Sequence, residues 1–511
     1  MGGVRGVLLD SSVLLPSDDG DFSGEASLLP GADYVLRKLR YSKIPTGIAH
    51  GLDLASPKIY FLQETARVYS FDCFVFSLTS EDDISGVVAH KWEDNGGDFI
   101  HVVSSYREEF SHKGSSSGWM KVIVGSAGRK SSNDAESIAA AGMLNIFLIH
   151  KLEELLLLIC NLNKKATNAE ALILGYAMKP SREEDFAKRG AFPLCPTPNG
   201  LIFLPFSYEI PILPQLQEVD AVLHKATDEI LAVDMSSSSE ICNNVTFTKN
   251  LQELQRLCRC IECQMNCCVI DPFINIFPVL DRLRIQQILI GLEALNIQGR
   301  CKIRAPNFLK VDSLDVPNLE QRLAEAKLSL PNIVKPQVAC GVADAHSMAI
   351  VFNVNHYKDL TVPLPSVVQE YVDHSSLLYK FYALGGKVFY TVKKSIPNAV
   401  TLMKLFAENG LKPLHFDSLK SLPTAKEQIN SDNHHIDFEL VTAAADWLRR
   451  TLDLTIFGFD VVVQDGTGDH VIVDVNYLPS FKEIPDDVAI PAFWDALKEK
   501  IKKSKLSTET S

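Results

Sequence analysis

The side chains with the most definite chemical potential are Asp460, Asp474 and Asn476, near the end of the segment Leu454–Pro479. Apolar runs on both sides of the polar stretch Gln464–His470 predict a β-hairpin. Because side chains alternate along a strand, Asp474 and Asn476 share one face, and an antiparallel partner brings Asp460 beside them. Two carboxylates and an amide oxygen suit Mg²⁺, which proteins hold through oxygen ligands and substrate phosphates. We therefore predict a magnesium site. The plain alternative is a solvated strand with chance acids, which the apolar surroundings disfavour.

A second group of residues could hold the phosphates of ATP. Lys335 stands near the end of a short apolar strand, residues 331–336, and a glycine-containing loop follows over residues 337–346. A strand lysine can cradle phosphates beside a loop in which Gly341 lets backbone N–H groups approach closely. This pattern alone does not define a nucleotide site. The P-loop pattern and the protein-kinase signatures H-R-D and D-F-G are absent from the sequence.

The strands that follow add a candidate adenine site and further lysines. The apolar run Ser366–Tyr371 predicts a strand whose end, through Val372, offers backbone groups to an adenine edge. Lys380 lies within the next predicted strand, Leu377–Leu384, and the strand after that ends at residues 393–395. Any one of these lysines alone is more simply a solvated strand edge. Their order is the informative feature, because strand lysine, glycine loop, hydrophobic strand and acidic hairpin follow one another along the chain.

These residues need a frame of strands and helices, and the chain predicts two such regions. Over residues 1–165, short apolar strands alternate with helical patterns, which indicates an α/β domain with a parallel sheet. The polar stretch Asn163–Glu170 predicts a linker, and a second α/β pattern covers residues 171–500. The polar stretch Phe416–His435 predicts a mobile loop near a site, and residues 501–511 a flexible tail.

Length and composition describe an ordinary soluble protein. The chain has 511 residues, 46% of them hydrophobic and 22% charged, which allows several domains with ample core. The net charge of −13 argues against general nucleic-acid binding. Charged residues interrupt the most apolar helix candidate, Ile138–Leu162, and the start lacks the apolar core of a secretory signal. We expect a monomer in the cytoplasm, with the nucleus as a second location, and no membrane or nucleic-acid partner.

The cysteines do not form a metal motif. Several crowd into Cys258–Cys268, but their spacing lacks the paired C-x₂-C form and has no nearby histidine. Cys260, Cys263 and Cys267 fall on one stripe of a helix, where a free cysteine behaves as a small buried hydrophobe. We predict core packing rather than zinc binding.

Beyond single residues, a set of short motifs occurs in a recognisable order. They are Leu174–Tyr176, Asp220–Asp228, Asp271-Pro272, Leu280–Arg282, Lys335-Pro336, Ala345–Phe352, Val367–Lys380, Ser395, Phe457–Asp460 and Val473–Pro479. In combination they resemble the ATP-grasp superfamily and, within it, the inositol 1,3,4-trisphosphate 5/6-kinase family, also called inositol-tetrakisphosphate 1-kinases. The resemblance covers about residues 171–500, and the long extension before it looks like that of a divergent plant branch of the family.

The resemblance implies roles for individual residues, with ATP as co-substrate and two Mg²⁺ ions. The residues that match nucleotide contacts are Arg282, Lys335, Gln369, Glu370, Val372, Lys380, Ser395 and Ser418. Those that match substrate contacts are Arg182, Lys225, His346, Lys380, Asn476 and Ser480. The matching magnesium ligands are Asp460, Asp474 and Asn476, and the catalytic set is Lys335, Asp474 and Asn476.

The implied reaction is transfer of the ATP γ-phosphate to a ring hydroxyl of an inositol tris- or tetrakisphosphate. It belongs to inositol phosphate metabolism toward phytate, and isomer interconversion is a further activity of such kinases. Three positions depart from the family pattern. Arg182 replaces a lysine and keeps its charge but not its shape, Ser480 replaces a glycine, and Leu422 replaces a serine. The substrate pocket is therefore altered. The alternative function is a non-catalytic inositol-phosphate-binding scaffold, which the retained magnesium ligands argue against.

The N-terminal region resembles the haloacid-dehalogenase-like phosphatases, because its first strand ends at Asp10. That family carries a second aspartate two residues later, where this chain has Ser12, and Lys130 is the candidate for its late lysine. Without the second carboxylate the general acid is missing, so we predict an inactive relative or an unrelated Rossmann-like module. A bifunctional protein with an active phosphatase is the remaining alternative.

Overall fold

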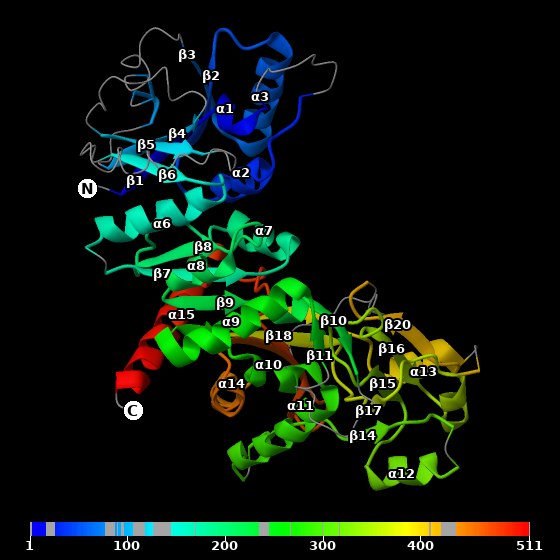
Figure 1. Cartoon of the computed structure of the whole chain (residues 1–511). Coiled ribbons are helices and arrows are strands. Elements are labelled where there is room, and N and C mark those ends of the chain that lie inside the picture. The colour runs from blue at the N-terminus through cyan, green and yellow to red at the C-terminus, as the bar shows by residue number, and fades with distance from the viewer. Residues whose placement is uncertain are drawn as a thin grey trace. The chain divides into compact units, whose positions relative to one another are not determined.

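A computed structural model describes residues 3–16, 26–76, 87–88, 90–92, 97–105, 118–125, 145–168, 170–234, 245–265, 267–298, 300–315, 317–407, 410–420 and 436–509 (Figure 1). The chain divides into two compact units. The N-terminal unit comprises Met1–Ala177, Glu183–Leu223 and Leu257–Cys268. The C-terminal unit comprises Met178–Arg182, His224–Arg256 and Val269–Ser511.

The N-terminal unit contains a parallel sheet whose described strands have the order β3-β2-β1-β4-β5-β6. The strands are β1 (Val4–Asp10), β2 (Thr46–Gly51), β3 (Asp72–Phe76), β4 (Asp98–Ser104), β5 (Trp119–Val124) and β6 (Ile146–Ile149). The helices are α1 (Ser11–Leu14), α2 (Ala32–Arg40), α3 (Ser56–Tyr69) and α6 (Glu154–Ala166). The central strand β1 is buried along almost its whole length, as expected of a parallel strand covered on both faces. The predicted α/β fold with a parallel sheet is confirmed.

A second sheet follows in the order β12-β9-β7-β8. Its strands are β7 (Leu172–Ala177), β8 (Leu201–Pro205), β9 (Ala221–His224) and β12 (Cys268–Ile270). The helices in this part of the sequence are α7 (Pro180–Lys188), α8 (Ile212–Gln217) and α9 (Lys249–Met265). Strands β7 and β8 belong to the N-terminal unit, although they lie beyond residue 170. The two compact units therefore have other boundaries than the domains predicted from the sequence, residues 1–165 and 171–500. Those domain boundaries stay a prediction.

The predicted linker Asn163–Glu170 is wrong at its start, because α6 continues to Ala166. Asn163 is fully buried. Its side-chain oxygen accepts from the backbone N–H of Val4 at 2.7 Å, and its amide donates to the carbonyl of Leu194 at 2.8 Å. A buried amide with both partners satisfied is an anchor of the fold. Polarity along the sequence does not distinguish such an anchor from a loop.

Three further sequence predictions need correction. Within the helix candidate Ile138–Leu162, strand β6 occupies Ile146–Ile149 and α6 begins only at Glu154. The expected flexible tail, residues 501–511, is helical as far as Glu509, and its Ile501 is buried. In the predicted loop Phe416–His435, the first two residues belong to a strand. The rest of that loop from residue 421 lies outside the described residues, as do Leu422 and Lys130.

The predicted helical stripe of cysteines is only partly within the described side chains. Cys258, on α9, is buried. Cys267 and Cys268 are also buried, but both lie beyond the end of α9 at Met265. The side chains of Cys260 and Cys263 lie outside the described ones.

The C-terminal unit contains two larger sheets, in the orders β13-β22-β21-β18-β19 and β14-β17-β15-β16-β20, and a hairpin of β10 and β11. The strands are β10 (Ile230–Val233), β11 (Val245–Phe247), β13 (Ile303–Arg304), β14 (Phe308–Val311), β15 (Asn332–Pro336), β16 (Ser347–Val351), β17 (Ser366–Glu370), β18 (Leu377–Leu384), β19 (Lys387–Lys394), β20 (Leu414–Asp417), β21 (Ile456–Val463) and β22 (His470–Tyr477). The helices are α10 (Phe273–Leu280), α11 (Arg282–Leu289), α12 (Leu319–Glu325), α13 (Ala399–Ala407), α14 (Phe438–Leu452) and α15 (Asp486–Glu509).

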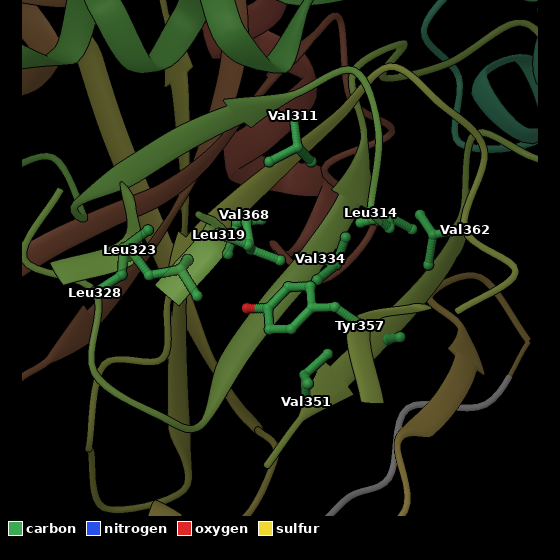
Figure 2. Close-up of a cluster of buried hydrophobic side chains, with 11 residues drawn as sticks. Val311, Leu314, Leu319, Leu323, Leu328, Val334, Val351, Tyr357, Val362 and Val368 are labelled. Carbon is green, nitrogen blue, oxygen red and sulfur yellow. The ribbon is translucent and has the colours of Figure 1, made fainter. Parts of the chain in front are cut away.

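A hydrophobic core covers one face of the sheet that contains β15, and it decides where Lys335 points (Figure 2). Val334 is fully buried in this core and pairs with Ala349 on β16 and Val368 on β17. Because side chains alternate along a strand, the next residue, Lys335, points to the opposite face. Burial of its apolar neighbour therefore fixes the direction of the lysine.

Candidate active site

The predicted acidic hairpin consists of strands β21 and β22. Asp460 pairs directly with Asp474, and Gly458 pairs with Asn476. On the other side of β21, Asp460 pairs with Lys380 on β18, and the Lys380 Nζ lies 3.9 Å from its carboxylate. Directly paired residues in an antiparallel sheet point to the same face. The structure therefore brings Lys380, Asp460, Asp474 and Asn476 to one face of one sheet, which we call the acidic face.

An irregularity in the hairpin connects the acidic face to Lys335. The register shifts after Asp460, so that Val461 pairs with Ile472 and Val473 is left without a partner on β21. Such a bulge frees backbone groups from the ladder. The Lys335 Nζ donates to the carbonyl oxygen of Val473 at 3.4 Å. The strand lysine and the acidic hairpin, predicted from segments far apart in sequence, therefore meet.

Burial makes the charges of this cluster depend on one another. Burial, reinforced by Asp474, raises the pKa of Asp460, while Lys380 and Lys335 oppose the change. Burial lowers the pKa of Lys335 to about 8, against the attraction of Asp474. A buried pair of carboxylates is readily ionised only beside added positive charge. Asn476 donates to Asp474 at 2.9 Å, which leaves its amide oxygen as an acceptor on the same face. These oxygen donors suit a divalent cation such as Mg²⁺.

Arg282 shapes the loop after Lys335. It is the first residue of α11, a helix capped by the Asp281 carboxylate, which accepts from the N–H of Leu283 at 2.8 Å. Its buried guanidinium donates to the carbonyls of Pro336, Val338, Ala345 and Ala339 at 2.7, 2.8, 3.0 and 3.3 Å. The structure thus shows Arg282 holding the backbone of the loop. The predicted contact with ATP phosphates would be an additional role.

Gly341 is required in the same loop for a reason that the sequence did not give. Its φ of +85° lies in the left-handed region, which side chains with a Cβ rarely adopt. A Cβ at this position would also lie 2.5 Å from the Cβ of Ile230. The glycine therefore lets the loop turn and pack closely against β10.

A cavity of about 230 Å³ lies beside the acidic face. The predicted substrate residues that line it are Arg182, Lys225, Lys380, Asn476 and Ser480. Arg182 donates to Asp228 through Nε at 2.5 Å and through Nη2 at 3.2 Å. Lys225 donates to the carbonyl of Tyr477, and burial lowers its pKa to about 8. The cavity therefore collects cationic side chains whose positions are fixed by protein partners.

Sequence reasoning missed several residues in and around this cavity. Asp228, which orients Arg182 from outside the lining of the cavity, lies within a motif used for the family resemblance, but no sequence pattern indicates the pairing. Tyr382 and Glu483 line the cavity, and neither was predicted to do so. His346 does not line it. Its Nδ1 lies 3.0 Å from the hydroxyl of Ser418, a predicted nucleotide contact.

Two family models match this chain. Residues 298–495 match the "Inositol 1,3,4-trisphosphate 5/6-kinase ATP-grasp domain", and residues 1–165 match "ITPK4, N-terminal HAD-like domain". The chain is 46% identical over 512 residues to inositol-tetrakisphosphate 1-kinase 6 from Oryza sativa subsp. indica, which covers 99% of this chain and 90% of that relative. The chain belongs to the inositol-tetrakisphosphate 1-kinase family. The predicted family, the ATP-grasp fold and the N-terminal haloacid-dehalogenase-like fold are confirmed.

A more distant relative matches about half of the chain. Inositol-tetrakisphosphate 1-kinase from Xenopus laevis is 26% identical over 274 residues, which covers 52% of this chain and 64% of that relative. The rice relative, by contrast, aligns over almost the full length. The N-terminal extension is therefore shared with a plant member of the family.

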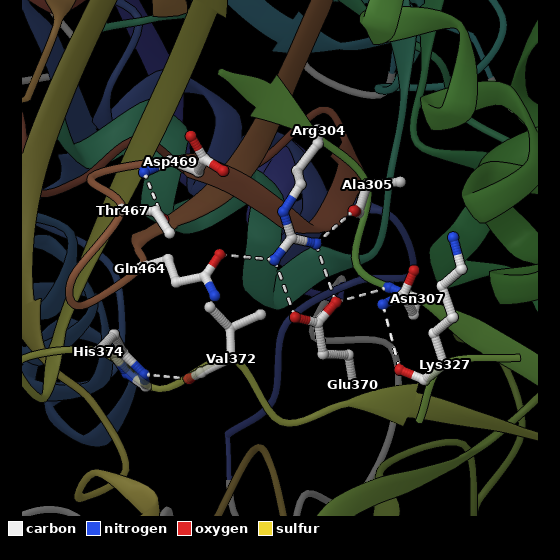
Figure 3. Close-up of polar contacts among 10 residues, drawn as sticks. All are labelled: Arg304, Ala305, Asn307, Lys327, Glu370, Val372, His374, Gln464, Thr467 and Asp469. Carbon is white, nitrogen blue, oxygen red and sulfur yellow. Dashed lines mark hydrogen bonds and ion pairs between the residues drawn. The ribbon is translucent and has the colours of Figure 1, made fainter. Parts of the chain in front are cut away.

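In this family member, the end of the strand predicted to line the adenine is held by contacts with the protein (Figure 3). Gln369, on β17, is buried. The carboxylate of Glu370 accepts from both terminal nitrogens of Arg304 at 2.8 Å, and from the backbone N–H of Asn307 at 2.8 Å. The same guanidinium donates to Gln464 at 2.8 Å. A bidentate pair of this kind is rigid. It fixes the end of β17, where backbone groups would meet an adenine edge.

A histidine links two more of the predicted nucleotide residues. His374 Nδ1 lies 2.8 Å from the carbonyl oxygen of Val372, and its Nε2 lies 2.9 Å from the hydroxyl of Ser395. All three side chains are buried. His374 therefore holds the ends of two segments together, and its role was not predicted.

The N-terminal HAD-like domain has its own cavity, of about 1140 Å³, beside the carboxyl ends of β1 and β4. Asp10 caps α1, because its carboxylate accepts from the N–H of Ser12 at 2.8 Å. The hydroxyl of Ser12 accepts from the backbone of Ser104 at 3.1 Å. In the structure, the residue at the place of the missing second aspartate is thus part of the local hydrogen bonding. Within the described parts of the chain, no helix combines the length and apolarity needed to cross a bilayer.

Proposed function

We propose that this chain transfers the γ-phosphate of ATP to a ring hydroxyl of an inositol tris- or tetrakisphosphate. One observation carries the proposal. The sheet register places Lys380, Asp460, Asp474 and Asn476 side by side at the edge of a cavity that also contains Arg182 and Lys225. Acidic residues for a metal thus adjoin basic residues for a substrate with several phosphates.

The nucleotide would bind between Lys335 and the end of β17. The ammonium of Lys335 would hold phosphates, with Arg282 keeping the loop 336–345 in shape. Gln369, Glu370 and Val372 would present backbone groups to the adenine. Ser395 and Ser418 would contribute further contacts, and each is already oriented by a histidine.

Asp460, Asp474 and Asn476 would hold two Mg²⁺ ions, which neutralise the charge that spreads over the transferred phosphoryl group. Arg182, Lys225, His346 and Lys380 would neutralise phosphates of the inositol ring, and Asn476 and Ser480 would add polar contacts. These residues align the hydroxyl with the γ-phosphate, and phosphoryl transfer depends mainly on such alignment. The local excess of cations explains how an acidic chain with a net charge of −13 can attract a polyanion.

We further propose that the kinase acts as a monomer in the cytoplasm or nucleus, in inositol phosphate metabolism toward phytate. Isomer interconversion, by reversal of the transfer with bound nucleotide, would use the same residues.

The test is phosphorylation of a panel of inositol tris- and tetrakisphosphates by the full chain with ATP and Mg²⁺, resolved by product isomer. We expect transfer to one or a few isomers. A matched protein carrying Asp474→Asn should bind the same compounds and transfer no phosphate. Binding without turnover by the unmodified protein would instead identify a scaffold.

A further inference from the structure

Glu483 is the unexpected residue of the substrate cavity. It lies after β22, in the turn before α15, and it lines the cavity with Arg182, Lys225 and Lys380. A carboxylate is out of place among cations that would bind phosphates, because it repels any phosphate that comes close. Its presence calls for a function of its own.

The fold brings Glu483 over the acidic face by a close backbone approach. Gly458, opposite Tyr382 on β18, has no side chain on that face. A Cβ there would lie 3.1 Å from the ring of Pro479 and 3.2 Å from the carbonyl oxygen of Phe381. Pro479 therefore packs directly over the glycine. The chain turns on both sides of this contact, at Leu478 before Pro479 and at Phe481 after it, both with positive φ, and Glu483 then lines the cavity.

Two hydrogen bonds fix the carboxylate of Glu483. Tyr382 donates its hydroxyl to one carboxylate oxygen at 2.7 Å, and Lys393 forms an ion pair with the other. Burial opposes ionisation, but the hydrogen bonds from Lys393 and Tyr382 outweigh it and lower the pKa of Glu483 to about 2. The group is therefore an anion under all physiological conditions, held in one orientation.

A carboxylate has about four lone-pair positions, and the donors above occupy only some of them. The remaining positions can accept a hydrogen bond from a hydroxyl but cannot tolerate an adjacent phosphate. Inositol phosphate isomers differ in which ring positions carry hydroxyls and which carry phosphates. A fixed anion in the cavity can therefore distinguish one isomer from another.

We propose that Glu483 determines isomer specificity: it accepts a hydrogen bond from a free ring hydroxyl of the substrate and rejects isomers with a phosphate at that position. This inference rests on the proposed inositol phosphate kinase function. It assigns the selection to one residue of the same cavity.

The test compares the unmodified protein with Glu483→Gln. Glutamine keeps the shape and can still accept from Tyr382, but it carries no charge. Dissociation constants are measured by calorimetry without ATP for a panel of inositol tris-, tetrakis- and pentakisphosphates, and kcat/KM is measured for the same panel. We expect at least one inositol phosphate that the unmodified protein rejects to bind the variant about tenfold or more tightly than it binds the unmodified protein.

Two further variants separate selection from a structural effect. Tyr382→Phe removes a hydrogen bond to Glu483 but keeps the anion, so it should not admit the rejected isomers. Asp495→Asn removes the ion pair between Asp495 and Lys387. Lys387 is on the same strand as Lys393, but neither Asp495 nor Lys387 lines the cavity, so this variant should behave as the unmodified protein. Thermal midpoints of all variants report whether each one is folded.

An unchanged ranking of dissociation constants in Glu483→Gln would overturn the proposal for Glu483 while leaving the kinase function intact. Equal broadening by Glu483→Gln and Tyr382→Phe would also overturn it, because the effect would then come from loop position. If the unmodified protein binds isomers selectively but transfers no phosphate, the kinase function fails and the calorimetric ranking still tests Glu483. Absence of any inositol phosphate binding would overturn both.

Discussion

At the scale of single residues, Asp474 interacts with several other residues of the site. It pairs with Asp460 across the hairpin, accepts from Asn476, and its charge favours the protonated forms of Lys335 and Arg282. One carboxylate thus serves both the proposed metal site and the lysine proposed to hold phosphates.

Asp474→Asn should therefore abolish phosphoryl transfer without unfolding the protein. Loss of residues that merely support metal ligands typically costs 10–100-fold, so loss of a direct ligand should lower kcat by about 100-fold or more. Isomer-resolved turnover and the thermal midpoint provide the two readouts. The control is Asp312→Asn, an exposed acid paired with Lys310. Normal turnover by a folded Asp474→Asn protein would refute the site.

A second residue-scale prediction concerns stability and pH. Asp271 is fully buried, and burial raises its pKa from 3.8 to about 6, against hydrogen bonds from Thr455. Between about pH 4 and 6 the folded chain keeps a proton that the unfolded chain has lost. Stability attributable to this group therefore falls as pH rises through that range, by at most about 3 kcal/mol.

In Asp271→Asn, the carboxyl group is replaced by an amide that does not titrate in this range and can still form hydrogen bonds with Thr455. We expect the variant to gain stability relative to the unmodified protein as pH rises from about 4 to 6, and the difference to level off above that range. Thermal unfolding of both proteins across this range checks the prediction. A difference that does not change with pH would contradict it.

At the scale of elements, the hairpin of β21 and β22 shows what could be predicted from sequence. The alternation of apolar and polar residues was enough to place Asp460, Asp474 and Asn476 on one face, and the register agrees. The bulge at Val473 and the return of the chain to Glu483 were not predictable in this way. Both depend on tertiary contacts, and loops carry no periodicity from which a partner could be read.

The same limit applies to Asn163 and Arg304. The polar pattern around Asn163 predicts a linker, although its amide is buried and bonded to Val4 and Leu194. Arg304 carried no motif, yet it fixes Glu370 and Gln464 at the proposed adenine site. Polar residues with tertiary partners look like surface residues when only the sequence is read.

Gly458 gives an element-scale prediction with a matched control. Gly458→Ala should push Pro479 and the turn after it away from the acidic face, because the new Cβ would be crowded by Pro479 and the Phe381 carbonyl. Displacement of Pro479, Ser480 and Glu483 from the cavity should lower kcat/KM for inositol phosphates by about 10- to 100-fold. Gly386→Ala, in the β18–β19 turn, has open space around its Cβ and should leave activity unchanged. Equal activity of the two variants would refute the role of the close approach.

At the scale of the whole molecule, a plant-type kinase carries an N-terminal HAD-like domain whose Asp10 is engaged in capping a helix. The hydroxyl of Ser12 accepts a backbone hydrogen bond and offers no second carboxylate. We expect the full chain with Asp474→Asn, in which kinase turnover is silent, to release no phosphate from a chromogenic phosphate monoester with Mg²⁺. Release that disappears on Asp10→Asn would instead establish a bifunctional protein.

The contact between Lys335 and the Val473 carbonyl has a thermodynamic meaning for nucleotide binding. Before ATP arrives, the ammonium already has an oxygen partner and a nearby carboxylate. In the proposed nucleotide site, arrival of a phosphate would thus be an exchange of partners at one nitrogen, and the affinity would reflect the difference between two oxygen environments rather than the full strength of either. Such an arrangement would keep the lysine compensated between catalytic cycles, and it would moderate how tightly the spent nucleotide is retained.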